Sequence, residues 1–335
     1  MKILFITHLN QNTTMMNDTL HDSILHGLRE IYGNDVIDYP GAWYMHEEEV
    51  KKRNFNINEL WGKGFTFYNI FSNYEQIDRS DIENKIVNNY FDIIIFGSIR
   101  RSSRFFAKVI NSKSKIIFID GEDNTTIDSK ILNKGVYFKR ELISNQSDKI
   151  YPINFSIPKK KIIEQINLNP KNVLAPLIPH KYSTYIYNNE DDYYKMWKDS
   201  IFGLTYVRGG WWDALRYYEM LMNGCIPLFI DIDRCPEKTL TKLPKKTLSY
   251  IFKNYSWILN KYFPTSIYKK KFLTSKKFYL YFSSLFKEKY NCQSLVDNYP
   301  EIMKIKVKLL NYTKENLTTE DIARDMISTT VKNYL

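Results

Sequence analysis

Cysteine is scarce in this 335-residue sequence, which contains only three. Cys225, Cys235 and Cys292 form an odd set without the close spacing of a metal knuckle, so we expect neither a disulfide framework nor a zinc site. Uninterrupted apolar segments are also missing, since no run reaches the ~18 residues that a membrane-spanning helix needs. The opening MKILFITHLNQN turns polar too early for a signal peptide, so we expect a cytoplasmic protein.

Acidic residues are fewer than basic ones: the sequence has 37 aspartates and glutamates and 48 lysines and arginines, which gives a net charge of +11. This excess favours anionic partners: phosphorylated substrates, nucleic acid or an anionic membrane surface. A surplus of solvated lysines explains it equally well, since the basic clusters at 159–161 and 269–271 are short. A hydrophobic content of 44% supplies a large core, and the length favours two domains.

Short apolar runs alternate with amphipathic segments in the first part of the chain. This alternation predicts a parallel α/β sheet, with strands at 2–7, 35–40, 91–98 and 115–123 and helices at 16–33 and 100–111. Ligands of such sheets bind at the carboxyl ends of the strands. His8, Gly97–Ser98 and Asp120–Glu122 fall at such ends and are therefore candidates for a site.

The chain changes character near residues 150–170, where prolines punctuate an extended segment. A second α/β unit follows, with strands at 201–207 and 225–231 around a helix at 211–223. The region after residue 250 is mostly helical in its spacing, and TTED at 318–321 fits a capping box. We therefore predict two Rossmann-like domains, residues 1–160 and 161–335, the second with a helical tail.

The stretch GGWWDALRYYE, residues 209–219, combines features of a phosphate site. Gly209 and Gly210 let the backbone approach a ligand closely, and a helix N-terminus with its free N–H groups follows them. Arg208 and Arg216 supply guanidinium groups that clamp a diphosphate, and Glu219 supplies a carboxylate that holds ribose hydroxyls. The alternative is an ordinary surface salt bridge between Arg216 and Glu219, three residues apart on the helix.

The strand after this helix extends the pattern to R-x-x-E-x-L-x-x-G-C-I-P-L, from Arg216 to Leu228. Over residues 200–247 it resembles the nucleotide-sugar-binding segment of GT-B glycosyltransferases, closest to the exostosin-like type. The resemblance implies two Rossmann-like domains facing a cleft, with Glu219 on the ribose and the preceding loop on the diphosphate. We include Trp212 and Asp213 among the expected donor-binding residues.

One position departs from the family's pattern. Many retaining GT-B enzymes carry two acidic residues eight apart around this helix. Here the residue eight before Glu219 is Trp211, and Asp213 is the nearest acid. This departure favours an inverting reaction, in which a base deprotonates the acceptor hydroxyl.

Candidate bases lie in the N-terminal half. His8 and Asp120 are our candidate catalytic residues, since a histidine oriented by a carboxylate can take a hydroxyl proton. Glu122, Lys139 and Arg140 are candidates for the wall of the cleft. The alternatives are a structural histidine, an acidic turn and a solvated charge cluster.

A metal motif is a weaker interpretation. The DID sequence, Asp231–Asp233, resembles the metal-binding motif of GT-A transferases, but a turn after a strand is favoured. Because arginines can neutralise a diphosphate, we expect no metal and no cofactor besides the nucleotide-sugar co-substrate. The tyrosine-rich segment 182–197 supplies aromatic faces for a base or a sugar.

The sequence thus predicts a glycosyltransferase that moves a sugar from a nucleotide-diphosphate donor to an acceptor hydroxyl. The expected acceptor is a glycan, a lipid-linked molecule or another hydroxyl compound, and the expected location is cytoplasmic, peripheral to the inner membrane face. Two alternatives stay open. One is a transferase acting on modified DNA bases or another nucleic-acid-binding protein, and the other is a non-catalytic nucleotide-binding module.

Overall fold

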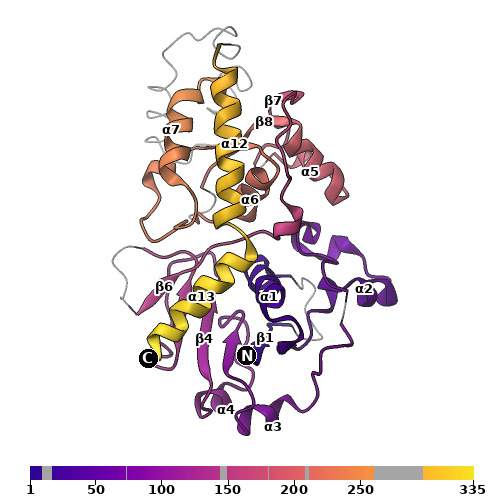
Figure 1. Cartoon of the computed structure of the whole chain (residues 1–335), viewed down its shortest axis with the longest axis vertical. Coiled ribbons are helices and arrows are strands. Elements are labelled where there is room, and N and C mark those ends of the chain that lie inside the picture. Colours follow the sequence, from indigo (N-terminus) through magenta and orange to yellow (C-terminus); the bar gives the residue numbers. More distant parts are fainter. Residues whose placement is uncertain (10–16, 73, 144–148, 180, 208–210, 260–296) are drawn as a thin grey trace.

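A computed structural model describes residues 1–9, 17–72, 74–143, 149–179, 181–207, 211–259 and 297–335. The described part is built on two parallel β-sheets that follow one another along the long axis of the molecule (Figure 1). Helices pack around both sheets, so the fold is mixed α/β as the sequence predicts. Within these residues, no helix combines the length and the apolar character needed to cross a bilayer.

The first sheet has six parallel strands in the order β2-β1-β3-β4-β5-β6. Their bounds are β1 Ile3–Ile6, β2 Val36–Tyr39, β3 Ile93–Phe96, β4 Lys115–Asp120, β5 Val136–Lys139 and β6 Ile150–Pro152. The order reverses between β1 and β3, which is where ligands of open α/β sheets bind. The helices of this half are α1 Thr19–Tyr32, α2 Glu47–Arg53, α3 Ile82–Val87 and α4 Phe106–Ile110.

Both faces of this sheet are buried, which explains why its strands are continuous apolar runs. In β3, Ile93 and Ile95 belong to the core that includes α1, whereas Ile94 and Phe96 belong to the core that includes α3 and α4. The alternation follows from the two-residue period of a strand. The sheet is thus a central layer, and its carboxyl edge holds His8, just after β1, and Asp120, at the end of β4.

The second sheet has three parallel strands in the order β7-β8-β9. Its strands are β7 Asn172–Leu174, β8 Ser200–Thr205 and β9 Ile226–Phe229, and its helices are α5 Glu190–Lys198, α6 Leu215–Met222 and α7 Lys245–Tyr255. β9 lies within the predicted strand 225–231 and β8 overlaps the predicted strand 201–207, whereas β7 was not predicted. The helix between β8 and β9 is shorter at its start than the sequence predicts, for a reason given below.

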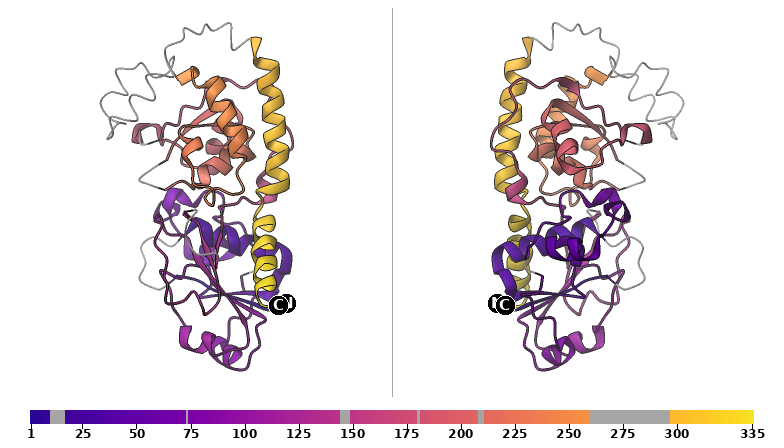
Figure 2. Two further views of the ribbon diagram at one scale, coloured as in Figure 1. Left: turned by 90° about the vertical axis from the view of Figure 1, so that its left-hand side faces the viewer. Right: turned by 90° about the vertical axis from the view of Figure 1, so that its right-hand side faces the viewer.

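Two C-terminal helices run along both sheets. α12 (Tyr299–Asn316) packs on α6, and α13 (Thr319–Asn333) packs on α1 of the first sheet, as Figure 2 shows. Thr318 caps α13 by accepting a hydrogen bond from the Asp321 amide at 3.2 Å, in agreement with the expected capping box. The last helix therefore lies with the N-terminal sheet, and a division at residue 160 stays a prediction.

Candidate functional site

A cavity of about 360 Å³ lies among α6, the N-terminus of α1 and the loop Trp61–Phe67. This volume falls in the range of small-molecule sites, about 300–1,000 Å³. Arg216 and Glu219 line it from α6. Aromatic rings supply much of the remaining wall, including Phe65, Phe67, Tyr185, Tyr187, Tyr193, Tyr206, Trp211 and Tyr217. Three of these rings come from the tyrosine-rich segment that the sequence singles out.

Glu219 is buried, with 5% of its surface exposed. Its Oε1 accepts a hydrogen bond from the Thr66 hydroxyl at 2.7 Å, and its Oε2 accepts one from the Tyr193 hydroxyl at 2.6 Å. Burial raises the pKa of this carboxyl, and the bonds from Tyr193 and Thr66 oppose the rise. Each carboxylate oxygen has two lone pairs, so Glu219 keeps acceptor capacity for further hydroxyl groups.

Arg216 projects from the same helix, and although burial opposes the rise, the nearby charge of Glu219 helps to raise its pKa. Its guanidinium lies over the Tyr185 ring, 5.3 Å from the centroid, and its Nε has no hydrogen-bond partner. No ion pair of Arg216 is found in the part of the chain that the structure describes, so the salt bridge with Glu219 considered above is not formed there. A cation held beside a cavity in this way suits an anionic ligand.

Helix α6 begins at Leu215, so the prediction of a helix from residue 211 is wrong in its first turn. The Glu141 carboxylate accepts hydrogen bonds from the backbone amides of Trp212 and Asp213, at 3.0 and 2.9 Å, and holds this segment outside the helix. The Trp212 ring packs 6.3 Å from that of Phe229. Neither Trp212 nor Asp213 lines the cavity, although both were expected to bind the donor.

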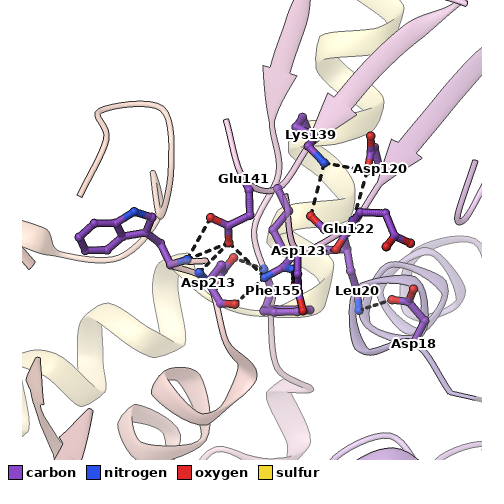
Figure 3. A network of polar contacts seen from close by, with 12 residues as sticks. Asp18, Leu20, Asp120, Glu122, Asp123, Lys139, Glu141, Phe155 and Asp213 are labelled. Atoms are coloured by element: carbon purple, nitrogen blue, oxygen red, sulfur yellow. Dashed lines mark hydrogen bonds and ion pairs between the residues drawn. The ribbon is translucent and has the colours of Figure 1, made fainter. Parts of the chain in front are cut away.

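Arg140 is the centre of a buried network that joins the first sheet to this segment. Its guanidinium donates to the carbonyl oxygens of Gly121, at 3.1 Å, and Asp213, and it pairs with the carboxylates of Asp123 and Glu141. Figure 3 shows Glu141, Asp123 and Asp213 converging here. The predicted cleft residue Arg140 thus lies at a junction between the halves, with 2% of its surface exposed.

The Asp213 side chain belongs to the same network. Its Oδ2 accepts a hydrogen bond from the Phe155 amide at 3.1 Å. Burial raises the pKa of Asp213 to about 7; the Glu141 charge adds to the rise and the Arg140 charge opposes it. This carboxyl is therefore a titratable group at the junction rather than a ligand of the cavity.

Asp120 ends β4 and is fully buried. Its carboxylate accepts hydrogen bonds from Lys139 Nζ at 2.8 Å, from Arg100 Nε at 2.9 Å and from the Tyr137 hydroxyl. Figure 3 shows Lys139 and Asp120. Burial alone would raise the pKa of Asp120, but the charge of Lys139 and these hydrogen bonds lower it. Such surroundings favour a structural role for Asp120 and Lys139 over the proton acceptor and cleft residue that the sequence predicts.

His8 follows β1 at the switch point of the sheet and is buried. Its ring meets that of His21 edge to face, with centroids 5.0 Å apart. Asp18 caps α1 beside them and pairs with Arg101 at 3.0 Å. Burial raises the pKa of Asp18, but the charges of Arg101, His8 and His21 outweigh it and lower the pKa below its ordinary value. The carboxylate near His8 is thus Asp18, whereas the sequence suggested Asp120.

The sequence reasoning missed two parts of this region. One is Asp18, whose position just before the amphipathic run of α1 is the usual signal of a helix cap. The other is the loop Trp61–Phe67, which lines the cavity through Lys63 and five other residues of the loop. Its Gly62-Lys63-Gly64 sequence signals a turn with unusual backbone angles. Nothing local in the sequence places this loop beside α6.

The remaining predicted residues lie elsewhere. Arg208, Gly209 and Gly210 lie outside the described residues. Glu122 pairs with Arg101 at 2.9 Å on the carboxyl edge of the first sheet.

The two aspartates of the DID sequence have separate surroundings. Asp233 pairs with Lys253 at 3.0 Å, and Asp231 sits at a left-handed turn with φ of 65°. Across the described residues, no three His, Cys, Asp or Glu side chains gather as metal ligands.

Comparisons with known proteins place the fold. No protein-family model matches the chain, and no curated protein matches it. Among solved structures, the chain is similar to the crystal structure of Alr3699/HepE from Anabaena in complex with UDP. The TM-score is 0.52 at 8% sequence identity, covering 99% of this chain and 100% of that one. At this identity the likeness shows the fold alone, and it supports a GT-B-type fold with a helical C-terminal region.

Proposed function

We propose that this chain is a glycosyltransferase that moves a sugar from a nucleoside-diphosphate sugar to an acceptor hydroxyl. The observation that carries the proposal is that Arg216 and Glu219 both line one aromatic-walled cavity. Among the described residues, Arg216 forms no ion pair within 4 Å. A structure of similar fold holds UDP, which supports a nucleotide as the ligand. The exostosin-like subtype rests on the sequence motif alone.

In this proposal, different cavity residues bind the diphosphate, the ribose and the base of the donor. Arg216 neutralises the diphosphate, as a guanidinium does for phosphate oxygens. Glu219 accepts hydrogen bonds from the ribose hydroxyls with its remaining lone pairs. The aromatic wall stacks on the base. Arg208, with the backbone of Gly209 and Gly210, stays a proposed part of the diphosphate site.

The acceptor side lies at the switch point of the first sheet, near α1. In the proposed step the acceptor oxygen bonds to the anomeric carbon while the bond from that carbon to the diphosphate breaks. The hydroxyl proton passes to His8, and Asp18 stabilises the resulting imidazolium. The diphosphate leaves with the electron pair, and Arg216 stabilises its charge. A transfer of this kind, in one displacement with a general base, is an inverting transfer.

The acceptor class and the location are proposals based on sequence. A net charge of +11 suits an acceptor at an anionic membrane surface in the cytoplasm, such as a lipid-linked glycan. A division into two domains at residue 160, with the acceptor bound by the first domain, is likewise a proposal based on the sequence. Transfer to DNA and a non-catalytic nucleotide-binding role are the alternatives, and slow hydrolysis of a bound donor would contradict the second.

Isothermal titration calorimetry with UDP, GDP, ADP and CMP, free and as sugar conjugates, tests the donor site. We expect Arg216→Gln and Glu219→Gln each to weaken binding of the preferred diphosphate about 10–100-fold, because each removes a charged hydrogen-bonding group. Arg234→Gln and Glu237→Gln are matched controls, since both residues are exposed and neither lines the cavity. Unchanged affinity in both site variants would refute the assignment.

A further inference from the structure

The loop Trp61–Phe67 crosses from the first half of the chain to the donor cavity with an unusual backbone. Gly62, Lys63 and Gly64 all have positive φ, at 57°, 58° and 62°. Thr66 has φ of 84°, a region that β-branched residues avoid. A non-glycine residue persists there only when its surroundings fix it, and such strain clusters at ligand sites.

Contacts with the other half fix Thr66 in this conformation. Its amide donates to Glu190 Oε1 at 2.6 Å, and its hydroxyl donates to Glu219 Oε1 at 2.7 Å. The same hydroxyl oxygen lies 2.6 Å from the Tyr194 hydroxyl, which donates to it. Thr66 therefore sets the orientation of the carboxylate that is proposed to hold the ribose.

Lys63 carries a charge that none of the described residues neutralises. Its Nζ donates to the carbonyl oxygen of Tyr187 at 3.0 Å and to the side-chain oxygen of Asn188, which are both neutral acceptors. An ammonium group has three N–H donors, so one remains for a ligand. Lys63 lines the same cavity as Arg216, from a different element.

We propose that the loop Trp61–Phe67 forms the second wall of the donor site, where Lys63 binds the diphosphate together with Arg216 and Thr66 positions Glu219 on the ribose. The inference rests on the proposed function and deepens it. A diphosphate carries more negative charge than one guanidinium neutralises, and a second cation across the cavity supplies the balance. The site is then assembled from segments more than a hundred residues apart, so a nucleotide would join the two halves.

The competing view is that Lys63 only ties the loop to Tyr187 and Asn188. Calorimetry with UDP and with uridine separates the two views, because only UDP has phosphates. We expect Lys63→Met to weaken UDP binding about tenfold and to leave uridine binding unchanged. Lys51→Met, at an exposed position of α2 outside the cavity, is the matched control and should bind both as wild type does.

A second pair of variants tests the positioning role of Thr66. Thr66→Ser keeps the hydroxyl, and Thr66→Val keeps the shape without it. We expect Thr66→Val to lose about fivefold of the preference for UDP over 2′-deoxy-UDP, and Thr66→Ser to retain that preference.

Equal losses for UDP and uridine in Lys63→Met, or equal preference in the two Thr66 variants, would overturn the inference and leave the proposed function standing. Wild-type protein that binds UDP, GDP, ADP and CMP no better than a buffer control would instead refute the proposed function, and the inference with it.

Discussion

The carboxylate of Asp120 illustrates how surroundings decide the role of a single group. A proton acceptor works best when its pKa lies near the operating pH and its oxygen faces the substrate. Asp120 has the opposite features, since Lys139, Arg100 and Tyr137 all donate to it and its pKa is lowered. Its position at the end of a strand invites a catalytic interpretation, but its partners come from β5 and from the segment after β3.

We predict that Asp120→Asn lowers the free energy of unfolding by about 3–5 kcal/mol, because it leaves the fully buried Lys139 without its carboxylate. Urea unfolding followed by circular dichroism measures the change. Asp233→Asn, which breaks an exposed pair with Lys253, should cost less than about 1 kcal/mol. A stable Asp120→Asn protein that has lost the proposed transferase activity would return Asp120 to the role of base.

At the scale of elements, local patterns located β1 to β4, β8 and β9, but neither β5 to β7 nor the start of α6. β3 and β4 could be predicted because apolar runs bounded by polar residues mark buried strands. The start of α6 could not, because Glu141, more than seventy residues away, binds the amides of Trp212 and Asp213. For the site, spacing placed Arg216 and Glu219 on one helix and both line the cavity, but spacing alone left a surface salt bridge open. The loop carrying Lys63 reaches the cavity only through tertiary contacts.

The contact between α1 and α13 leads to a prediction at this scale. A Cβ atom on Gly27 would lie 2.0 Å from the Thr319 carbonyl oxygen, so the two backbones must separate in Gly27→Ala. We expect a loss of about 1–3 kcal/mol from this overpacking, although alanine is the better helix former by about 1 kcal/mol. Thermal unfolding measures it, with the exposed Ser328→Ala on α13 as the control. An unchanged or raised melting temperature in Gly27→Ala would contradict the packing described here.

At the scale of the whole molecule, the network of Arg140, Glu141 and Asp213 connects the edge of the first sheet to the segment that leads into α6. Asp123 and the Phe155 amide complete it. Because α6 carries Arg216 and Glu219, this junction positions the two proposed donor-binding residues relative to the first sheet. Within this network, the Asp213 carboxyl has a pKa raised to about 7.

That shift predicts a dependence of stability on pH. In the unfolded chain an aspartate ionises near 3.8, whereas folded Asp213 keeps its proton to about 7. The folded state therefore binds more protons between about pH 4 and pH 7, and the contribution of Asp213 to the free energy of unfolding falls as pH rises through this window. Asp213→Asn removes the titration, so relative to wild type it should gain about 2–3 kcal/mol between pH 5 and pH 8.

Urea unfolding at several pH values in this interval checks the slope. Asp191→Asn, at an exposed position of α5, serves as the control and should run parallel to wild type across the series. A constant difference between Asp213→Asn and wild type from pH 5 to pH 8 would show that Asp213 is already ionised in the folded protein.

The return of α13 to the first sheet has a consequence for how the chain is made. During synthesis β1 and α1 are made well before α13, the helix that covers α1. Until α13 has been synthesised, the apolar side of α1, which includes Ile24 and Leu28, lacks its packing partners Ile322 and Met326. The first half therefore completes its core only after the second half has been synthesised, and this order makes the folding of the first sheet's helical cover depend on the synthesis of the second sheet.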